Sequence, residues 1–565
     1  MSRLRLNAPP RATAKAGGGG APAIVSGRLD RWTIAAWLIA ALAAIPILMI
    51  VISAPSGGMD ALAEMAASIL PRYLLNTSVL MLLTGLLAAA IGVTTAWLVS
   101  AARFPGRRIV SWALVLPLAV PAYIAAYIYA DLLAVTGPVQ ESLRGLTGWQ
   151  IGEYAFPQIR SLPGAAIILA LVLYPYVYLL ARAAFAAQSL GQFRAARSLG
   201  ATPARAFRRV ALPAARPAIA GGLALVLMET LADFGVAEYF AIPTFSTGIF
   251  RSWLAMGDKQ LALKLAAFML VFVIALIALE ATSRRGRTDS KDAVKNDEAL
   301  IHLSGWQQWL ALFVCALPVL LGFAIPGLHL LLLALDVGDQ LSAANLWSYT
   351  QSSLWLGLSA ALVCVIAAII LAYAQRRSAN RTTRAAIRLA TLGYALPGAL
   401  LAVGLLAPLG VFDQAITRFS RDTFGFNHGL LLTGTAAILV YALSVRFLTV
   451  AFNSVSSGFE KVPPSLDAAA RSLGASPGAV MRRIHIPLLS PSIAAAAALV
   501  FIDTLRELPA TLILRPFNLE TLATRVYRLA SDEKLAEAST ASLIILVAGL
   551  VPVLMLNRAA KAGSR

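Results

Sequence analysis

The chain has 565 residues, of which 59% are hydrophobic and 13% are charged, and its mean hydropathy is +0.75. A soluble protein of this size does not need so much apolar surface, so the composition excludes that class and indicates a helical membrane protein with many spans. The net charge is +20, but the basic residues gather in alternate loops between apolar segments. This is the positive-inside pattern, and it argues against nucleic-acid binding.

The first half of the chain is predicted to hold six membrane spans behind a basic tail. Residues 1–31 are basic and rich in Gly and Pro, which is typical of a disordered cytoplasmic tail. The apolar run 33–53 is longer than the core of a signal peptide and lacks a cleavage site, so it is expected to be an uncleaved first span. This half covers residues 32–282, and its further spans are expected at 74–100, 109–131, 163–187, 218–242 and 262–282.

The second half repeats the plan of the first. Residues 283–306 are the most polar stretch of the chain and predict a cytoplasmic linker between the halves. The second half, residues 307–560, is followed by a short cytoplasmic tail at 561–565. Its spans are expected near 308–335, 351–375, 386–411, 429–453, 491–514 and 537–557. The predicted fold class is an all-α membrane protein with about twelve transmembrane helices in two homologous six-helix halves.

One polar, Arg-rich stretch occurs twice and relates the two halves. Residues 195–220 read AARSLGATPARAFRRVALPAARPAIA, and residues 469–494 read AARSLGASPGAVMRRIHIPLLSPSIA. The copies align without a gap at an offset of 274 residues (469 − 195), and about half of the positions are identical. A repeat in fixed register over such a distance indicates two related halves.

Each copy predicts a helix, a tight turn and a second helix. Gly200 is suited to the position just after a helix, where φ is positive. Thr202 and Pro203 then predict an N-cap and a first-turn proline, and the second helix is expected to stop near Pro213. The second copy repeats this pattern with Gly474, Ser476, Pro477 and Pro487. We call these two segments the elbows.

The elbows resemble the cytoplasmic loop shared by permease subunits of ABC-type importers, in which a coupling helix docks on the ATPase subunit. The pattern is two alanines, a glycine four residues later, and a hydrophobe followed by proline. The family usually has Glu before the alanines, whereas Arg194 and Ala468 stand there in this chain. The matching positions are Ala195, Ala196, Gly200, Leu212 and Pro213 in the first elbow and Ala469, Ala470, Gly474, Ile486 and Pro487 in the second.

Four carboxylates follow the elbows in the same register. METLAD at 228–233 and IDTLRE at 502–507 place Glu229 opposite Asp503, and Asp233 opposite Glu507. Each pair is spaced i, i+4 and is predicted to share one face of a helix near mid-membrane. Acids there are expected to face the bundle interior or a water-filled path. They either line a path for a cation such as ferric iron, or tie helices together with Arg506 as a neutralising partner.

Other segments resemble ferric-iron importer permeases, in which both halves are fused in one chain. They are LPLAVPAYIAAY at 116–127, METLADFGVAEYF at 228–240, TFSTGIFRSW at 244–253, GYALPGALLAVGLL at 393–406 and ELPATLILRPF at 507–517. The resemblance implies the type I ABC importer permease fold, a location in the inner membrane, two ABC ATPase subunits on the cytoplasmic side and an extracytoplasmic substrate-binding protein.

The chain has no Gly-Lys dipeptide and hence no phosphate-binding P-loop, so ATP is expected to be used by a partner subunit, and no bound cofactor is expected. The four histidines are scattered and form no cluster with cysteine, so no metal site is assigned. No catalytic constellation supports an enzyme. The alternatives are a thiamine, polyamine or anion permease of the same class, and a proton-coupled secondary transporter that uses Glu229 and Asp503.

Overall fold

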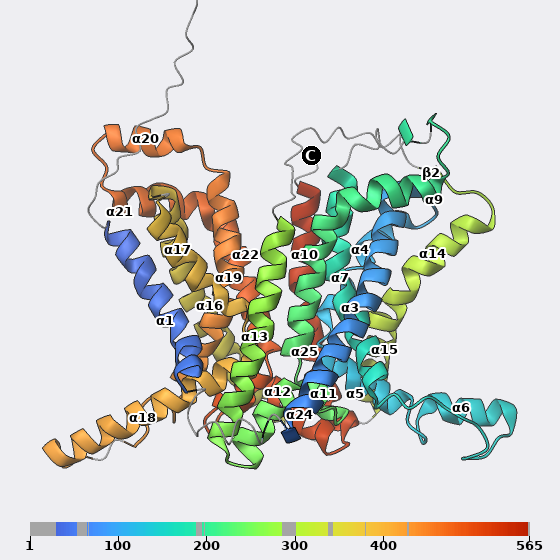
Figure 1. Ribbon diagram of the computed structural model, residues 1–565, viewed down its shortest axis with the longest axis horizontal. Coiled ribbons are helices and arrows are strands. Elements are labelled where there is room, and N and C mark those ends of the chain that lie inside the picture. The colour runs from blue at the N-terminus through green and yellow to red at the C-terminus, as the bar shows by residue number, and fades with distance from the viewer. Residues whose placement is uncertain are drawn as a thin grey trace, which may run out of the picture.

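The computed structural model is a helical bundle with a pseudo-repeated plan (Figure 1). It describes residues 30–53, 65, 67–187, 195–196, 198–284, 301–336, 343–378, 380–426 and 429–562. Most of the predicted N-terminal tail, Arg194, residues 285–300 of the predicted linker and residues 563–565 lie outside the described residues.

The first half begins with long helices and ends with a set of short ones before its last span. A two-residue parallel pairing, β1 (Ala102–Arg103) with β2 (Ile301–His302), joins it to the segment that leads into the second half. The helices are α1 (Arg31–Ser53), α3 (Leu70–Ala101), α4 (Arg107–Ala113), η1 (Leu116–Ala119), α5 (Ala122–Leu132), α6 (Pro138–Thr147), α7 (Leu162–Ala187), α9 (Pro203–Ala206), η2 (Phe207–Ala211), α10 (Leu212–Ala232), α11 (Gly235–Tyr239), α12 (Phe245–Phe250), η3 (Arg251–Ala255) and α13 (Lys259–Arg284).

The second half follows the same order, with a longer helix in place of the separate α5 and α6. Its helices are α14 (Trp306–Val319), η5 (Leu320–Ala324), α15 (Ile325–Asp336), α16 (Ala343–Arg377), α17 (Arg381–Ala390), η6 (Thr391–Ala395), α18 (Gly398–Phe424), α19 (Ala436–Glu460), α20 (Pro464–Ser472), α21 (Pro477–Val480), η7 (Met481–His485), α22 (Ile486–Leu505), α23 (Pro509–Leu514), α24 (Leu522–Ser531) and α25 (Leu535–Ala562).

The described residues hold ten helices that are long and apolar enough to cross a membrane. A further pair, Arg107–Ala119 and Ala122–Leu132, is apolar enough only when taken together and is bent by 93°, so it adds an eleventh crossing if it forms one broken span. The predicted last span, 537–557, falls in α25, whose described apolar stretch Leu535–Val551 is shorter than a full span. The expectation of about twelve spans is therefore close to the ten or eleven found.

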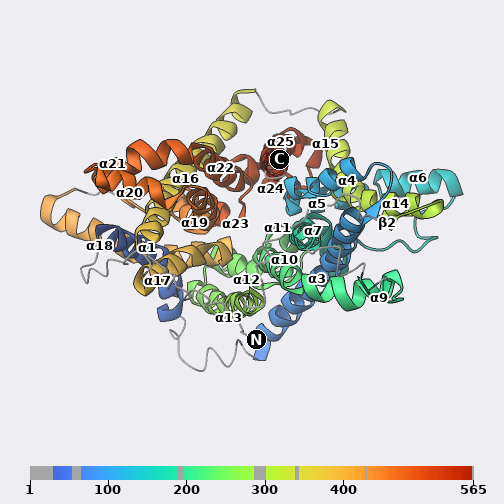
Figure 2. The same cartoon turned by 90° about the horizontal axis from the view of Figure 1, so that it is seen from above.

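The first helix of each half packs against the opposite half. In the two views α1 lies beside α16, α17 and α18 of the second half, and α14 lies beside α3 and α4 of the first (Figures 1 and 2). An ion pair also holds α1 against the second half, because Arg377 at the end of α16 donates from Nε to Asp30, just before α1, at 2.6 Å. The sequence boundaries of the halves are therefore not their spatial boundaries.

The spans expected at 218–242 and 491–514 are not continuous helices. α10 ends at Ala232 and the chain continues as the short helix α11, while α22 ends at Leu505 and continues as α23. The same halves are interrupted a second time, because extended residues at Val120–Pro121 and Leu396–Pro397 separate η1 from α5 and η6 from α18. Proline has no N–H to donate, which favours a break at these points.

Glycines allow close helix crossings in the first half. A Cβ placed on Gly92 of α3 would lie 2.8 Å from Val177 Cβ, and one on Gly222 of α10 would lie 2.7 Å from Val177 Cα. Helices α3 and α10 therefore approach the backbone of α7 more closely than any larger residue permits. This close approach fixes α10, the helix that carries Glu229.

We predict that Gly222→Ala lowers the free energy of unfolding by about 1–3 kcal/mol, because the new methyl group must push α10 away from α7. Gly221→Ala is the matched control, since its Cβ would meet only Leu180 Cδ1 at an ordinary 3.7 Å. Thermal unfolding of both variants in detergent checks this. Equal Tm values for the two variants would contradict the close packing.

Candidate functional site: two elbows and a pocket between the halves

Both elbows close their first helix with the same hydrogen bonds. Ala201 donates its N–H to the carbonyl of Ala196 at 3.0 Å, and Ala475 donates to Ala470 at 3.0 Å. This pattern, in which a residue just beyond the helix bonds back five positions, is a Schellman motif and needs a left-handed residue. Gly200 has a φ of 85° and Gly474 a φ of 77°, so the predicted turn is confirmed at both sites.

The second helix of each elbow starts as predicted. The hydroxyl of Thr202 accepts a hydrogen bond from the N–H of Arg205, and that of Ser476 accepts one from Ala479, each at 3.3 Å. These hydroxyls satisfy a backbone donor that the first helical turn leaves unpaired. Pro203 and Pro477 occupy the first turn.

The prediction that this second helix stops near Pro213 and Pro487 is wrong. Instead, the chain passes through one π-helical turn, η2 or η7, and continues into α10 or α22. The wider turn keeps the helix running where proline cannot donate its usual hydrogen bond. The two π-turns are related by the same offset of 274 residues (481 − 207). Each elbow therefore continues without a break into a long helix, α10 or α22.

An exposed leucine marks the turn of each elbow. Leu199 is 88% exposed and Leu473 is 86% exposed, and each directly precedes the left-handed glycine. Both elbows lie at the same end of the bundle, at the top of Figure 1. Exposed arginines accompany them at positions 208, 209, 482 and 483. A bulky apolar side chain held on a rigid turn is suited to insertion into a groove of a partner protein.

A carboxylate, Asp467, lies one residue before position 468, just ahead of the second elbow. Asp467 in α20 accepts a hydrogen bond from Arg376 Nε at 2.7 Å, and its other oxygen lies 2.9 Å from Nε2 of the fully buried His485. Arg376 also donates to the carbonyls of Phe459 and Val462, both at 2.9 Å. An ion-paired cluster therefore ties the second elbow to α16 and α19.

The first elbow rests on aromatic rings instead. The ring of Trp97 lies 4.7 Å from that of Phe207 in the π-turn and 5.3 Å from that of Phe185, measured between centroids. The positions equivalent to Arg376 and His485 are Ala102 and Ala211 (376 − 274 and 485 − 274). The two elbows thus share a backbone but not the packing beneath them.

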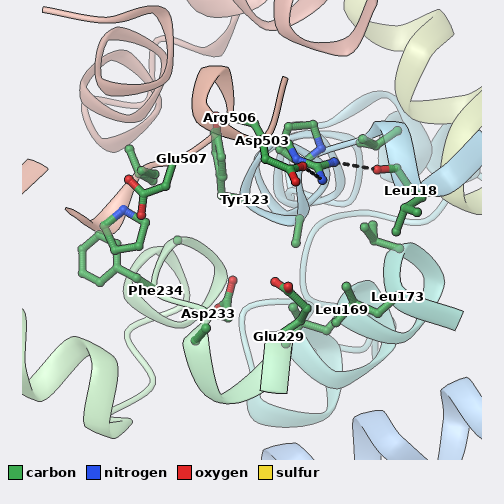
Figure 3. A pocket seen from close by; sticks show the side chains of 18 of the residues that line it. Leu118, Tyr123, Leu169, Leu173, Glu229, Asp233, Phe234, Asp503, Arg506 and Glu507 are labelled. Carbon is green, nitrogen blue, oxygen red and sulfur yellow. Dashed lines mark hydrogen bonds and ion pairs between the residues drawn. The ribbon is translucent and has the colours of Figure 1, made fainter. Parts of the chain in front are cut away.

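All five predicted path residues line one pocket between the halves. Glu229, Asp233, Asp503, Arg506 and Glu507 surround a cavity of about 150 Å³, which also borders η1, α5 and η6. Figure 3 shows the carboxylates of Glu229 and Asp233 pointing into this space from one side and Asp503 and Arg506 facing them from the other. The prediction that these acids face the bundle interior is consistent with this arrangement.

Arg506 is bound within the pocket wall. Its Nη2 pairs with Asp503 at 2.5 Å, and its Nη1 donates to the carbonyl of Leu118 in η1 at 3.0 Å. Glu229 lies opposite and accepts a hydrogen bond from Tyr394 Oη at 3.4 Å. The pair Glu229 and Asp503 is related by the repeat, yet only Asp503 has an arginine three residues later.

Asp233 and Glu507 do not lie on the same helix faces as Glu229 and Asp503, so that part of the prediction is wrong. Both follow the helix end and instead accept hydrogen bonds from the first turn of the next helix. Asp233 accepts from Val236 at 3.5 Å and Ala237 at 3.1 Å. Glu507 accepts from Ala510 at 3.1 Å and from both Thr511 donors at 3.0 Å. These two acids stabilise the interrupted backbone.

Arg446 and three tyrosines of the pocket were not predicted from the sequence. Arg446 on α19 donates to Glu507 at 3.0 Å, and both side chains are largely buried. Tyr123, Tyr176 and Tyr394 also line the pocket. The signal for Arg446 was present, since a single charge in the apolar segment 429–453 marks a residue that must face a polar interior.

The pocket presents four carboxylates and two guanidinium groups, so it has an excess of two negative charges (4 − 2) when all six are ionised. Asp233 and Glu507 accept hydrogen bonds from the backbone of the next helix, and Asp503 pairs with Arg506. Within the described residues no three His, Cys, Asp or Glu side chains are placed to hold a metal ion together. The acids are therefore spread around the cavity and do not converge on one point.

Comparison with known proteins places the chain in a family. Residues 82–285 and 364–562 each match the binding-protein-dependent transport system inner membrane component family. The chain belongs to this family. It carries the permease domain twice, and it is a multi-pass inner-membrane permease of the ABC importer class with both halves fused in one chain.

Individual relatives differ in the cargo that their names give. A Fe(3+)-transport system permease protein of Haemophilus influenzae is 25% identical over 91% of this chain and 95% of its own length. A putative 2-aminoethylphosphonate transport system permease protein of Salmonella typhimurium is 26% identical over 38% of this chain and 75% of its own. A probable molybdenum ABC transporter permease protein of Haloferax volcanii is 31% identical over 36% of this chain and 71% of its own.

We predict that Arg446→Met lowers the free energy of unfolding by about 3–5 kcal/mol, because it strands the buried carboxylate of Glu507. The double variant Arg446→Met/Glu507→Gln is expected to recover most of this loss, since glutamine still accepts from the first turn of α23. Denaturation of the purified chain in detergent measures both.

The control for this prediction is Arg160→Met, which breaks the exposed pair with Glu533 at 3.3 Å and is expected to cost under about 1 kcal/mol. Equal losses for Arg446→Met and for the double variant would show that the burial of an unpaired charge is not the cause.

Proposed function

We propose that this permease translocates ferric iron through the pocket between its halves, driven by two ABC ATPase subunits that dock on the elbows. The observation that carries the cargo assignment is the pocket's excess of carboxylates, which are hard oxygen donors suited to a trivalent cation. A relative that aligns over 91% of the chain is named for Fe(3+), which supports the same cargo.

An anionic cargo is disfavoured by the state of the pocket arginines. Arg506 is paired with Asp503, and Arg446 is paired with Glu507. Each guanidinium is therefore already neutralised by a carboxylate, which would repel an anion. Thiamine and polyamines are cations and remain the runners-up within the class. A proton-coupled transporter would use the same acids but would have no use for two exposed elbow turns.

The way that the elbows are connected to the pocket supports alternating access. Each elbow continues through its π-turn into α10 or α22, and each of these helices ends at the pocket. Closure of the ATPase pair draws the elbows together and moves the ends of α10 and α22 that border the pocket. An extracytoplasmic binding protein delivers the ion at the opposite end of the bundle. Two equivalent halves related by a parallel repeat suit this motion.

The elbow assignment predicts that Gly200→Val/Gly474→Val inserts in the membrane normally but loses ATP-driven uptake. A β-branched residue at φ near +80° costs about 1–2 kcal/mol per site or more, so the turn that presents each leucine is distorted. A Cβ at either glycine would meet no atom of the described residues within 4 Å, so the effect comes from the backbone alone.

Gly478→Val is the matched control, because Gly478 is also in an elbow and has open space around it, but has no positive φ. Uptake and ATPase activity are measured in the complex with its ATPase and binding protein. Wild-type uptake in the double variant would overturn the elbow assignment.

The cargo assignment predicts ATP-dependent uptake of labelled ferric ion in cells that express the chain with its ATPase and binding protein. Glu229→Gln and Asp503→Asn are expected to lower this uptake at least several-fold, since each removes a charge that faces the path. Uptake of thiamine or a polyamine in place of iron, by an assembled complex that hydrolyses ATP, would reject iron and retain the class.

A further inference from the structure

Two amphipathic segments project sideways from the bundle, and nothing in the proposed transport function uses them. We call them the lateral arms: α6, residues 138–147, and the outer part of α18, residues 411–424. Figure 1 shows them running outward at opposite edges of the molecule, level with the ends of the spans that lie farthest from the elbows. In the view from above they again lie at opposite ends of the long axis (Figure 2).

The arms are counterparts in the two halves. Adding the offset of 274 residues to 138–147 gives 412–421, which lies within the second arm. The first arm is a separate helix after a break, whereas the second continues the helix that begins at the pocket with Gly398. The same placement by two different backbone routes indicates that the position of the arms has a role of its own.

Each arm carries apolar residues at the spacing i, i+4, i+7, which places them along one helical face. They are Val139, Leu143 and Leu146 in the first arm and Phe412, Ile416 and Phe419 in the second. Leu146 is 87% exposed and Phe419 is 65% exposed. Gln414, Arg418 and Arg421 have the same spacing on another face of the second arm, and all three are exposed.

Both arms are held in place by the chain segments next to them. Asp413 is fully buried and accepts hydrogen bonds from the N–H of Leu432 at 3.0 Å and of Thr433 at 2.7 Å. In the first arm, Gln140 donates to the carbonyl of Leu133 at 2.9 Å and accepts from Tyr154 Oη at 2.8 Å. The apolar faces are therefore presented by braced helices.

We propose that the lateral arms lie in the outer leaflet of the bilayer, with their apolar faces among the acyl chains and their polar faces at the headgroups. The apolar surface of the spans continues into the arms. Val51 and Ile52, in the last turn of α1 beside α18, are 55% and 61% exposed, and Leu335 at the end of α15 is 76% exposed. An amphipathic helix at this depth buries its apolar face in the headgroup–acyl boundary.

The position of the arms argues for lipid over the substrate-binding protein as the occupant. A binding protein must deliver cargo to the pocket between the halves, near the pseudo-twofold axis, whereas the arms extend away from that axis at the perimeter (Figure 2). Aromatic residues and arginines side by side, as at Phe419, Arg418 and Arg421, are typical of the membrane interface.

Site-directed spin labelling tests this inference on the full transport complex in vesicles of phosphatidylethanolamine and phosphatidylglycerol. Single cysteines are introduced as Leu146→Cys and Phe419→Cys on the apolar faces, and as Glu141→Cys and Gln414→Cys on the polar faces as matched controls. The native Cys315 and Cys364 are fully buried, so the label attaches selectively to the new residues. Collision rates with oxygen and with a water-soluble nickel chelate are then compared.

We expect the ratio of oxygen to nickel collisions to be several-fold higher at Leu146→Cys and Phe419→Cys than at the two controls, with or without the binding protein. Equal ratios, with ready access of nickel to all four sites, would overturn the inference by placing the arms in water. Protection of the apolar sites from both reagents only when the binding protein is added would also overturn it, because the arms would then be a protein-docking surface.

Discussion

A backbone that is interrupted inside a bilayer must still satisfy its donors, and this constraint shapes the centre of the protein. α10 ends at Ala232 and α22 at Leu505, and the next helices begin with unpaired N–H groups. Asp233 and Glu507 accept those donors, so two of the four pocket acids are required by the fold whatever the cargo is. With Glu229 and Asp503 they give the pocket four carboxylates against the two guanidinium groups of Arg446 and Arg506.

The residues around the two capping acids, Glu507 and Asp233, either balance the charge or leave room for the backbone. Glu507 is balanced by Arg446, and a Cβ on Gly398 would lie 2.4 Å from its carboxylate oxygen, so only glycine lets α18 begin at that point. On the other wall, a Cβ at Gly235 would lie 2.4 Å from Tyr123 Cβ. Four backbone interruptions thus meet at one place, and the pocket exists because the helices stop there.

The sequence-based predictions agree with the structure where a few adjacent residues determine the backbone conformation. The turn at Gly200 and the cap at Thr202 depend on a few adjacent residues, and the second copy doubles the signal. The prediction for Asp233 failed, because an i, i+4 spacing describes one face only if the helix continues, and its end is set by packing in the bundle. The exchange of α1 between halves, the pairing of Asp467 with Arg376, and the contact of Arg446 with Glu507 join residues far apart in sequence, so no local pattern predicts them.

The backbone of the repeat is the same in both halves, whereas the side chains around it differ. The backbone and the side chains therefore meet different requirements. The glycine turns, π-turns and broken pocket helices recur at one offset, as the proposed transmission of one movement from both elbows to the pocket requires. The contacts beneath them need not match: aromatic rings support one elbow and an Arg–Asp–His cluster the other. In the pocket, Glu229 faces Tyr394 while its counterpart Asp503 binds Arg506. Fusion of the halves in one chain permits this, since a symmetric pair of identical subunits would place the same residue on both walls and double every charge around the path.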